Sequence, residues 1–197
     1  MRVIAGELGG VHLAAPRGTG TRPTTDKVKG AIFGMLGEAA GTGRVLDLFA
    51  GSGGLGIEAL SRGADWCDFV DRSPDAVASV VANLQRTRLA DVARVVRGDA
   101  HKFLAVVREP YDLILCDPPY GWGPMEDTLT RVAQRSVMRD GAVLVVETGR
   151  RDPSVNAPAG LVVDRVRTYG DTVVTILIAT HAEPAGSVRN DVTCGAC

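Results

Sequence analysis

Residues 45–56 read Val-Leu-Asp-Leu-Phe-Ala-Gly-Ser-Gly-Gly-Leu-Gly, an apolar run that leads into a cluster of glycines. The run predicts a buried strand, and the glycines predict a tight turn into a helix whose first N–H groups are free to face a ligand. Open α/β sheets bind their ligands at the carboxyl ends of strands. The stretch therefore predicts an α/β fold with a small-molecule site directly after a central strand.

Short apolar runs alternate with helical patterns after this point, which predicts a doubly wound, Rossmann-like sheet that is mostly parallel. The expected strands are Val45–Phe49, Trp66–Asp71, Ala93–Arg97, Leu113–Asp117 and Ala142–Thr148, followed by Leu161–Tyr169 and Thr172–Ile178. The expected helices are Gly56–Arg62, Pro74–Arg86, Lys102–Arg108 and Met125–Arg135. Gly170-Asp171 is typical of a hairpin turn, so we expect the last two strands to form an antiparallel pair.

The chain of 197 residues is expected to have three parts. Residues 1–38 predict a small β-hairpin and a helix at Asp26–Leu36, because the apolar positions there recur at helical spacing. Residues 39–181 form the main domain, and residues 182–197 predict a flexible tail. The tail ends in Cys194-Gly-Ala-Cys197, whose role as a loose end or as a redox or metal pair stays open.

Composition limits the possible partners only weakly. The net charge of −1 gives no general signal of nucleic-acid binding, so any such surface must be local. The first 29 residues hold only two acids, Glu7 and Asp26, beside five basic residues: Arg2, Arg17, Arg22, Lys27 and Lys29. The chain has no membrane-length apolar run, no signal peptide and no four-ligand zinc spacing. We expect a cytoplasmic protein without a bound metal or a membrane partner.

Two cofactors compete for the glycine turn. Gly51, Gly53 and Gly56 satisfy the dinucleotide fingerprint, and Asp71 follows twenty residues after Gly51, as a ribose-binding acid should. Asp47, however, lies within the strand just before the glycines, where its carboxylate would repel a pyrophosphate and attract a cationic amine. S-adenosylmethionine has that amine and no phosphate. The turn therefore favours S-adenosylmethionine over NAD.

Two further acids follow the next strands. Asp71 can accept both ribose hydroxyls, and Ser73 is the better cap for the helix that follows it. Asp99 suits the adenine amino group, but a helix N-cap explains it equally well. The residues expected to bind the cofactor are Asp47, Phe49, Ala50, Gly51, Ser52, Gly53, Asp71, Arg72, Asp99 and Ala100.

The string Asp117-Pro118-Pro119-Tyr120 ends the fourth expected strand and is the predicted catalytic loop. Two prolines fix the backbone and remove two donors, so that the Asp117 carboxylate and the Pro118 carbonyl can accept from one exocyclic amine. Tyr120 offers a face on which a base can stack, worth about 1–3 kcal/mol. The loop therefore predicts transfer of a methyl group to the amino group of a nucleic-acid base.

Several alternatives remain at this point. A DNA amino-methyltransferase is the closest, although the chain has no large insertion for sequence recognition. A cytosine-C5 enzyme would need a thiolate, and Cys116 is expected inside the strand before the loop. An NAD-linked oxidoreductase would leave residues 117–120 unexplained. A non-catalytic RNA-binding assembly factor on the same fold would bind the cofactor without transfer.

The motifs together resemble class I methyltransferases, and a narrower resemblance over residues 2 to about 180 is to the RsmD family. It is carried by Arg2-Val-Ile-Ala-Gly, Arg22-Pro-Thr-Thr-Asp-Lys-Val-Lys29, Leu46-Asp-Leu-Phe-Ala-Gly-Ser-Gly53, Leu55-Gly-Ile-Glu-Ala-Leu-Ser-Arg62 and Asp117-Pro-Pro-Tyr120. The family consists of bacterial small-subunit rRNA guanine-N2 methyltransferases. The resemblance implies methylation of guanine 966 of 16S rRNA in a partly assembled subunit. We expect the protein to act as a monomer.

The resemblance also implies an RNA surface near the amino terminus. It assigns Arg22, Pro23, Thr24 and Lys27 to the cofactor and RNA surface, and the basic character of the segment adds Arg2, Arg17 and Lys29 as residues that bind phosphates. Gly30 departs from the family pattern, which usually has an acid there, and the residues from Ala182 onward match nothing in the family.

Overall fold

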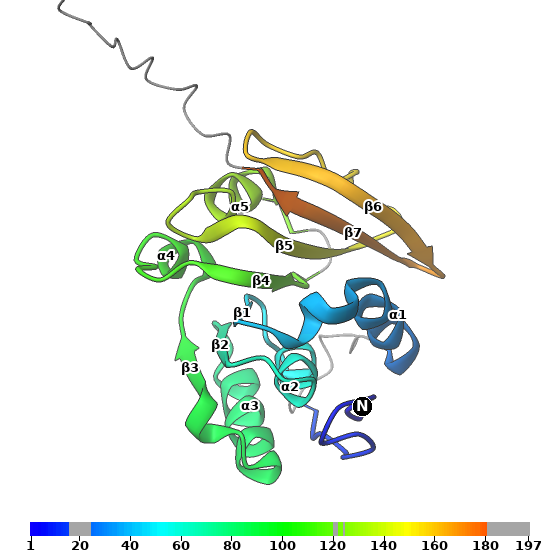
Figure 1. The fold of residues 1–197 in the computed structure, drawn as a ribbon, viewed down its shortest axis with the longest axis vertical. Helices are drawn as coiled ribbons and strands as arrows, with labels where there is room; N and C mark the ends of the chain where they lie inside the picture. Colours follow the sequence, from blue (N-terminus) through cyan, green and yellow to red (C-terminus); the bar gives the residue numbers. More distant parts are fainter. Residues whose placement is uncertain (16–24, 120–121, 124, 181–197) are drawn as a thin grey trace, which may run out of the picture.

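The computed structural model describes residues 1–15, 25–119, 122–123 and 125–180, and a seven-stranded sheet in the order β3-β2-β1-β4-β5-β7-β6 forms its centre (Figure 1). The strands are β1 (Arg44–Asp47), β2 (Trp66–Asp71), β3 (Ala93–Arg97), β4 (Tyr111–Cys116), β5 (Met138–Gly149), β6 (Leu161–Tyr169) and β7 (Thr172–Ala179). Neighbours among β1 to β5 pair in parallel, whereas β7 is antiparallel to both β5 and β6. The expected mostly parallel sheet with an antiparallel carboxyl-terminal pair is confirmed.

Helices cover both faces of the sheet. They are α1 (Asp26–Leu36), α2 (Gly54–Ser61), α3 (Pro74–Thr87), α4 (Ala100–Leu104) and α5 (Met125–Val132), with short 3₁₀ turns η1 (Gly37–Gly41) and η2 (Ala90–Val92). The apolar residues of α1, α2 and α3 join one buried core, and those of α4 and α5 join a second. Figure 1 shows how these helices lie around the sheet. No helix of the described ranges is long and apolar enough to cross a membrane.

Alternate residues of the central strands divide between these two cores. In β1, Val45 packs toward α1 and α2, while the next residue, Leu46, packs toward α4 and α5. Leu113 and Ile114 of β4 repeat this division. Since both faces are covered, the strands are almost continuously apolar, as parallel sheets require.

Some ends of the elements differ from the expected ones for local reasons. β5 begins at Met138 rather than at Ala142, because Met138 pairs with Tyr111 before a register shift that includes Gly141 at φ 74°. α4 begins at Ala100 rather than at Lys102, because the Asp99 carboxylate caps it. α5 ends at Val132 rather than at Arg135, and α2 covers Gly54–Ser61 in place of Gly56–Arg62.

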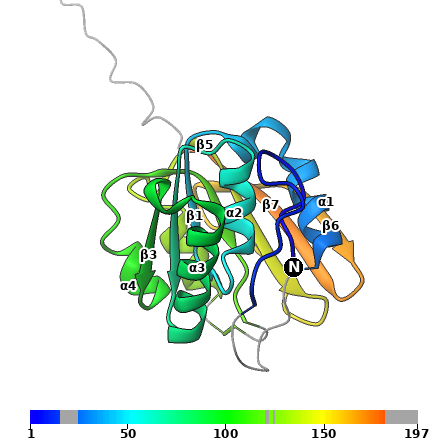
Figure 2. The ribbon, with the colours of Figure 1, turned by 90° about the horizontal axis from the view of Figure 1, so that it is seen from below.

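The amino-terminal segment is a looser hairpin than we expected. One antiparallel bridge joins Arg2 to His12, rather than two full strands. Side chains of the helices hold the segment instead, since Glu58 on α2 accepts the N–H groups of Ile4 and Ala5 at 2.7 and 3.0 Å. Figure 2 shows this segment passing beside α2. Residues 182–197 lie outside the described part of the chain.

A buried ionic network joins the amino-terminal ends of four strands. Asp68 on β2 is fully buried and accepts from Arg94 on β3 at 2.9 and 3.2 Å. It also accepts from the Tyr111 hydroxyl and pairs with Arg44 at 3.5 Å. Burial, with the adjacent Asp68 charge, raises the pKa of Tyr111, so this hydroxyl remains a donor. The network links β1, β2, β3 and β4 at the sheet edge opposite the glycine turn.

Replacing Asp68 with asparagine is expected to lower the free energy of unfolding by about 3 kcal/mol. The change removes the buried negative charge that Tyr111, Arg44 and Arg94 share, which is far more costly than the loss of a surface pair. Urea unfolding followed by circular dichroism measures the effect. Arg94→Ala is the control and should cost about 1 kcal/mol or less, because that side chain is 55% exposed. Equal losses for both variants would contradict this account of the network.

Candidate active site

The glycine turn leaves the carboxyl end of β1 at the centre of the sheet. After β1, the N–H groups of Leu48 and Ala50 still bond to carbonyls of Leu115 and Val70, at 2.9 and 3.0 Å. Gly53 then adopts φ 77° as the residue before α2, a conformation that glycine tolerates best. A Cβ on Gly56 would lie 2.4 Å from the Phe69 ring, so this glycine allows α2 to pack directly on β2. The two glycines have different tasks, one in the turn and one in packing.

Asp47 ends β1 beneath this turn and is buried. Its carboxylate accepts the Gly56 N–H at 2.9 Å. Burial, aided by the charges of Asp117 and Asp71, raises the pKa of Asp47 from 3.8 to about 7. An ammonium group would restore the charged form of this carboxylate. The position of Asp47 therefore suits a cationic amine, as the sequence predicted.

Asp71 lies at the end of β2, beside the same turn. Its two carboxylate oxygens accept the N–H groups of Gly51 at 2.9 Å and of Ser73 at 2.8 Å. Ser73, not Asp71, caps α3 by accepting the Ala76 N–H, as expected. Asp71 thus holds the glycine turn in place and keeps lone pairs that can accept ribose hydroxyls.

Asp99 caps α4 and also borders the cavity. Its carboxylate accepts the Lys102 N–H at 3.1 Å, so the capping interpretation is confirmed. Because Asp99, Gly98 and Ala100 all line the cavity, a contact with adenine remains compatible with the cap. The helix cap is therefore a contact in the structure, and the contact of Asp99 with adenine stays a prediction.

One cavity of about 390 Å³ brings the predicted cofactor and catalytic residues together. It is lined by the expected residues Asp47, Phe49, Ala50, Gly51, Ser52, Asp71, Arg72, Asp99, Ala100, Asp117, Pro118 and Pro119. Gly53 is buried in the turn behind the lining. Tyr120 lies outside the described residues. Residues separated by more than 60 positions in the chain thus meet at the carboxyl edge of the sheet.

The sequence reasoning missed several residues of the cavity. Glu147 and Thr148 near the end of β5 line it, and Glu147 is only 4% exposed. The signal was present, because Glu147 is a charged residue at the end of the apolar run Val143-Leu-Val-Val. Met1, Thr25 and Thr172 also line the cavity, and only the tertiary fold brings them there.

Trp122 is a further missed residue and forms an aromatic wall. Its ring meets Phe49 edge to face, with 5.1 Å between the centroids. Its indole N–H donates to the Thr128 hydroxyl on α5 at 3.1 Å, and that hydroxyl also bonds to the Nε2 atom of His101 at 2.8 Å. The His101 ring lies 3.2 Å from the Asp127 carboxylate through Nδ1. Contacts from α4 and α5 therefore hold Trp122 beside the cavity.

The residues predicted to bind nucleic acid have different positions. Arg2 and Lys27 are exposed, and Arg2 pairs with Asp26 at 3.3 Å. The assignment of Lys29 was wrong, because its side chain is fully buried and pairs with Glu58 at 3.2 Å. Burial lowers the pKa of Lys29, while Glu58 opposes this effect. The predicted contacts Arg17, Arg22, Pro23 and Thr24 lie outside the described residues.

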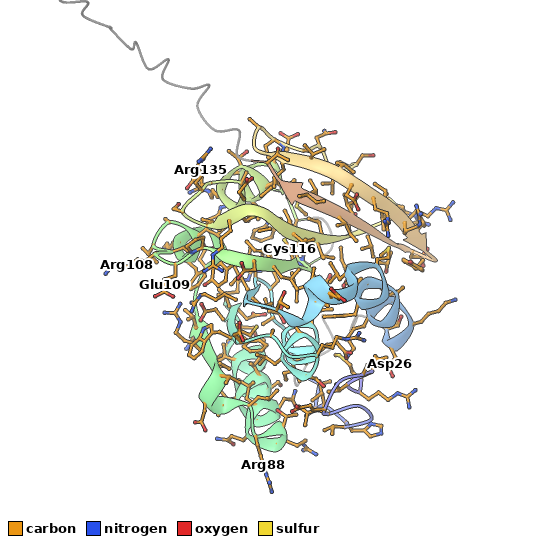
Figure 3. All side chains as sticks on the ribbon, in the orientation of Figure 1. Asp26, Arg88, Arg108, Glu109, Cys116 and Arg135 are labelled. Carbon is orange, nitrogen blue, oxygen red and sulfur yellow. The ribbon has the colours of Figure 1, made fainter. Side chains whose placement is uncertain are left out.

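Cys116 takes no part in the chemistry of the cavity. It is the last residue of β4 and is buried, directly before Asp117 (Figure 3). Burial raises the pKa of its thiol, which keeps the sulfur protonated and unreactive. The expectation that Cys116 lies inside the strand is confirmed. A cytosine-C5 mechanism has no nucleophile at this position.

Comparison with known proteins identifies the family. The family model "Conserved hypothetical protein 95" matches residues 1–178. The chain belongs to this family, the RsmD family. It is 45% identical over 179 residues to a putative rRNA methyltransferase, YlbH, of Bacillus subtilis, which covers 89% of the chain and 97% of that protein. It is 34% identical over 170 residues to the ribosomal RNA small subunit methyltransferase D of Escherichia coli K12, covering 86% of the chain and 85% of the relative.

Solved structures agree with this family membership. The putative methyltransferase yhhF of Escherichia coli superposes with a TM-score of 0.81 at 31% identity, over 91% of this chain and 98% of that one. More distant methyltransferases, such as SMU.776 at 15% identity and a TM-score of 0.62, share the fold alone. Both the fold and the family argue against an NAD-linked oxidoreductase. This member of the RsmD family is a methyltransferase.

The residues of the cavity fit S-adenosylmethionine as the cofactor of this RsmD-family member. Acidic residues outnumber basic ones in the cavity lining, with Asp47, Asp71, Asp99, Asp117 and Glu147 against Lys29 and Arg72. Such a set favours a ligand that carries positive charge and disfavours a pyrophosphate. The glycine turn also lets the backbone approach the ligand closely. S-adenosylmethionine, with its cationic amine and sulfonium and no phosphate, meets these conditions.

The affinity for S-adenosylmethionine is expected to fall as the pH drops below about 7. Asp47 is a carboxylate above its pKa and a neutral acid below it, and only the carboxylate pairs with an ammonium group. With a pKa of about 7, the carboxylate fraction falls about tenfold from pH 8 to pH 6, and the Kd should rise by about this factor. Calorimetric titration at both pH values measures it.

The matched control for this prediction is Asp47→Asn. That variant should bind S-adenosylmethionine weakly at both pH values, because the amide carries no charge to titrate. The Kd of Asp47→Asn should differ by no more than about twofold between pH 8 and pH 6. If it still changed about tenfold, the assignment of the pH dependence to this residue would be contradicted.

Proposed function

We propose that this protein transfers a methyl group from S-adenosylmethionine to the exocyclic N2 of a guanine in 16S rRNA. The observation that carries the proposal is that Asp117, Pro118 and Pro119 line the same cavity as the glycine turn and Asp47. The relatives named as small-subunit rRNA methyltransferases support the RNA substrate. The resemblance to the RsmD family supports guanine 966 as the target nucleotide.

The catalytic loop would hold the amine of the target base. The Asp117 carboxylate and the Pro118 carbonyl accept the two hydrogens of the amine, which fixes the nitrogen and reduces the delocalisation of its lone pair. The bound cofactor supplies a methyl group that is already activated on a cationic sulfur. As the N–C bond forms, the S–C bond breaks, and the nitrogen then loses one proton, for which we assign Asp117 as the base.

A guanine must leave its stack to reach this loop. Enzymes that modify bases extrude the nucleotide into a pocket and hold it by stacking and by contacts to its edge. Phe49 and Trp122 supply an apolar wall to the cavity, and we assign the stacking face itself to Tyr120.

The amino-terminal region would hold the RNA near the cavity. Arg2 and Lys27 are exposed, and Thr25 lines the cavity a short distance away. We assign phosphate contacts to Arg2, Lys27, Arg17, Arg22 and Thr24, and a contact with the RNA to Pro23, which has no N–H to donate. In this proposal the protein acts as a monomer in the cytoplasm, on a small subunit that is partly assembled.

Transfer of labelled methyl groups to different nucleic acids tests the proposal. Small subunits from cells that lack the protein, free 16S rRNA and duplex DNA are each incubated with the purified protein and S-adenosylmethionine. Label should enter the RNA as N2-methylguanosine. Preferential labelling of DNA would instead support the DNA amino-methyltransferase alternative. Binding of the cofactor without transfer to any substrate would support the assembly-factor alternative.

A further inference from the structure

A second basic element lies at the edge of the cavity, in the turn after β5. Thr148 lines the cavity, and the turn Gly149-Arg150-Arg151-Asp152 follows at once. Consecutive Cα atoms are 3.8 Å apart, so the first arginine begins within about 8 Å of a residue of the cavity wall. The turn therefore lies at the carboxyl edge of the sheet, where a bound substrate would enter.

The turn is held in place by its own hydrogen bonds. The Asp152 carboxylate accepts the Gly149 N–H at 2.7 Å, and the Asp152 N–H donates to the Gly149 carbonyl at 3.0 Å. The Arg150 N–H donates to the Asp171 carbonyl in the β6–β7 turn at 2.8 Å. Because the backbone is fixed on both sides, the two arginines occupy defined places at its tip.

Both arginine side chains are exposed. Among the described residues, the ion pairs of the molecule include neither guanidinium group. The nearest acid of the turn, Asp152, already has a backbone N–H as its partner. Two exposed guanidinium groups on an ordered turn are suited to phosphates, which arginine contacts through two parallel hydrogen bonds.

We propose that Arg150 and Arg151 bind phosphates of the substrate RNA at the rim of the cavity formed by β5 and the β6–β7 turn. This surface belongs to a different element from the amino-terminal region that carries Arg2 and Lys27. The acids inside the cavity would repel phosphates, so contacts at the rim would admit the target base and keep the backbone outside. The inference rests on the proposed function, since it names a second contact for the same substrate.

The test compares two double variants with the same change in charge. Arg150→Glu/Arg151→Glu removes the proposed contact. Arg86→Glu/Arg108→Glu is the control, because both side chains are exposed and neither lines the cavity. Arg86 lies in the last turn of α3, and Arg108 lies before β4, where Figure 3 labels it. Binding of free 16S rRNA and of small subunits is measured as a function of salt, together with the KM and kcat of methyl transfer.

The rim variant should raise the KM for RNA at least tenfold and leave the Kd for S-adenosylmethionine unchanged. Its plot of log affinity against log salt should be shallower by about 1.4 to 1.8, which corresponds to two lost phosphate contacts. Arg150→Lys/Arg151→Lys should keep most of the slope, because the charge remains. The control variant Arg86→Glu/Arg108→Glu should leave the slope of log affinity against log salt unchanged.

Equal salt slopes for the rim variant and the control would overturn the inference. A loss of affinity for assembled subunits alone, with unchanged binding of free 16S rRNA, would assign the turn to a ribosomal protein and would overturn it as well. If the wild-type protein bound RNA without methylating it, the proposed function would fail, while the comparison of slopes would still decide the role of Arg150 and Arg151.

Discussion

Replacing Asp117 with alanine is expected to lower the rate of methyl transfer about a thousandfold and to change the affinity for S-adenosylmethionine by no more than about twofold. Asp117 follows β4 directly and lines the cavity next to the prolines of the loop. The carboxylate would hold the amine of the base, whereas cofactor contacts come mainly from the glycine turn and the neighbouring strands. The effect should therefore appear in kcat.

Single-turnover transfer to small subunits, with calorimetric titration of the cofactor, separates the two effects. Asp117→Asn is the control, because an amide oxygen keeps one acceptor in the same place, and it should retain more activity than Asp117→Ala. Normal methylation of rRNA by Asp117→Ala would mean that the catalytic loop is wrongly assigned. An equal loss of cofactor affinity and of rate would place Asp117 in the cofactor site instead.

Replacing Glu58 with alanine is expected to lower the free energy of unfolding by about 4 kcal/mol. The Glu58 side chain is fully buried and pairs with buried Lys29 at 3.2 Å and with Arg62 at 2.9 Å. It also accepts the N–H groups of Ile4 and Ala5. Its loss would leave the buried Lys29 ammonium group without its counter-charge, with only carbonyls of Arg2 and Gly54 as acceptors, and would leave two backbone donors unsatisfied. Denaturant unfolding, with hydrogen exchange of residues 1–15, measures both consequences.

Two comparisons separate the charge from the backbone contacts. Lys29→Met/Glu58→Leu should recover part of the stability, because no unpaired buried charge remains, but the amino-terminal segment should still exchange rapidly. Glu7→Ala, at an exposed position, should change the stability by less than about 0.5 kcal/mol. If Glu58→Ala were as stable as Glu7→Ala, the ion pair would not anchor the amino-terminal segment.

The local pattern predicted most of the fold because the strands are short, apolar and regularly separated by helices. β2, β3 and β6 have the expected bounds, and so does α1. The start of β5 was missed because a register shift interrupts the alternation before Ala142. The amino-terminal hairpin was overestimated, because side chains of α2 and α3 satisfy backbone groups that a second strand would otherwise pair.

The sequence predicted those residues of the site that lie at strand ends or in recognisable motifs. Asp47 and Asp71 end strands, Asp99 and the Asp-Pro-Pro loop follow strands, and parallel strands bring such residues to one edge. Lys29 was wrongly assigned because a basic residue in a basic segment is normally exposed, whereas its partner Glu58 lies 29 residues away. Trp122 was missed because only tertiary packing places it against the cavity, whereas the position of Glu147 at the end of an apolar run was a signal that was not used.

The most direct test of the central claim is mass mapping of modified nucleosides in 16S rRNA from cells that lack this protein, before and after incubation with it and S-adenosylmethionine. We predict that one N2-methylguanosine is absent in the deletion strain and is restored by the wild-type protein, but not by Asp117→Ala. An rRNA whose guanine methylation is the same with and without the protein would contradict the account.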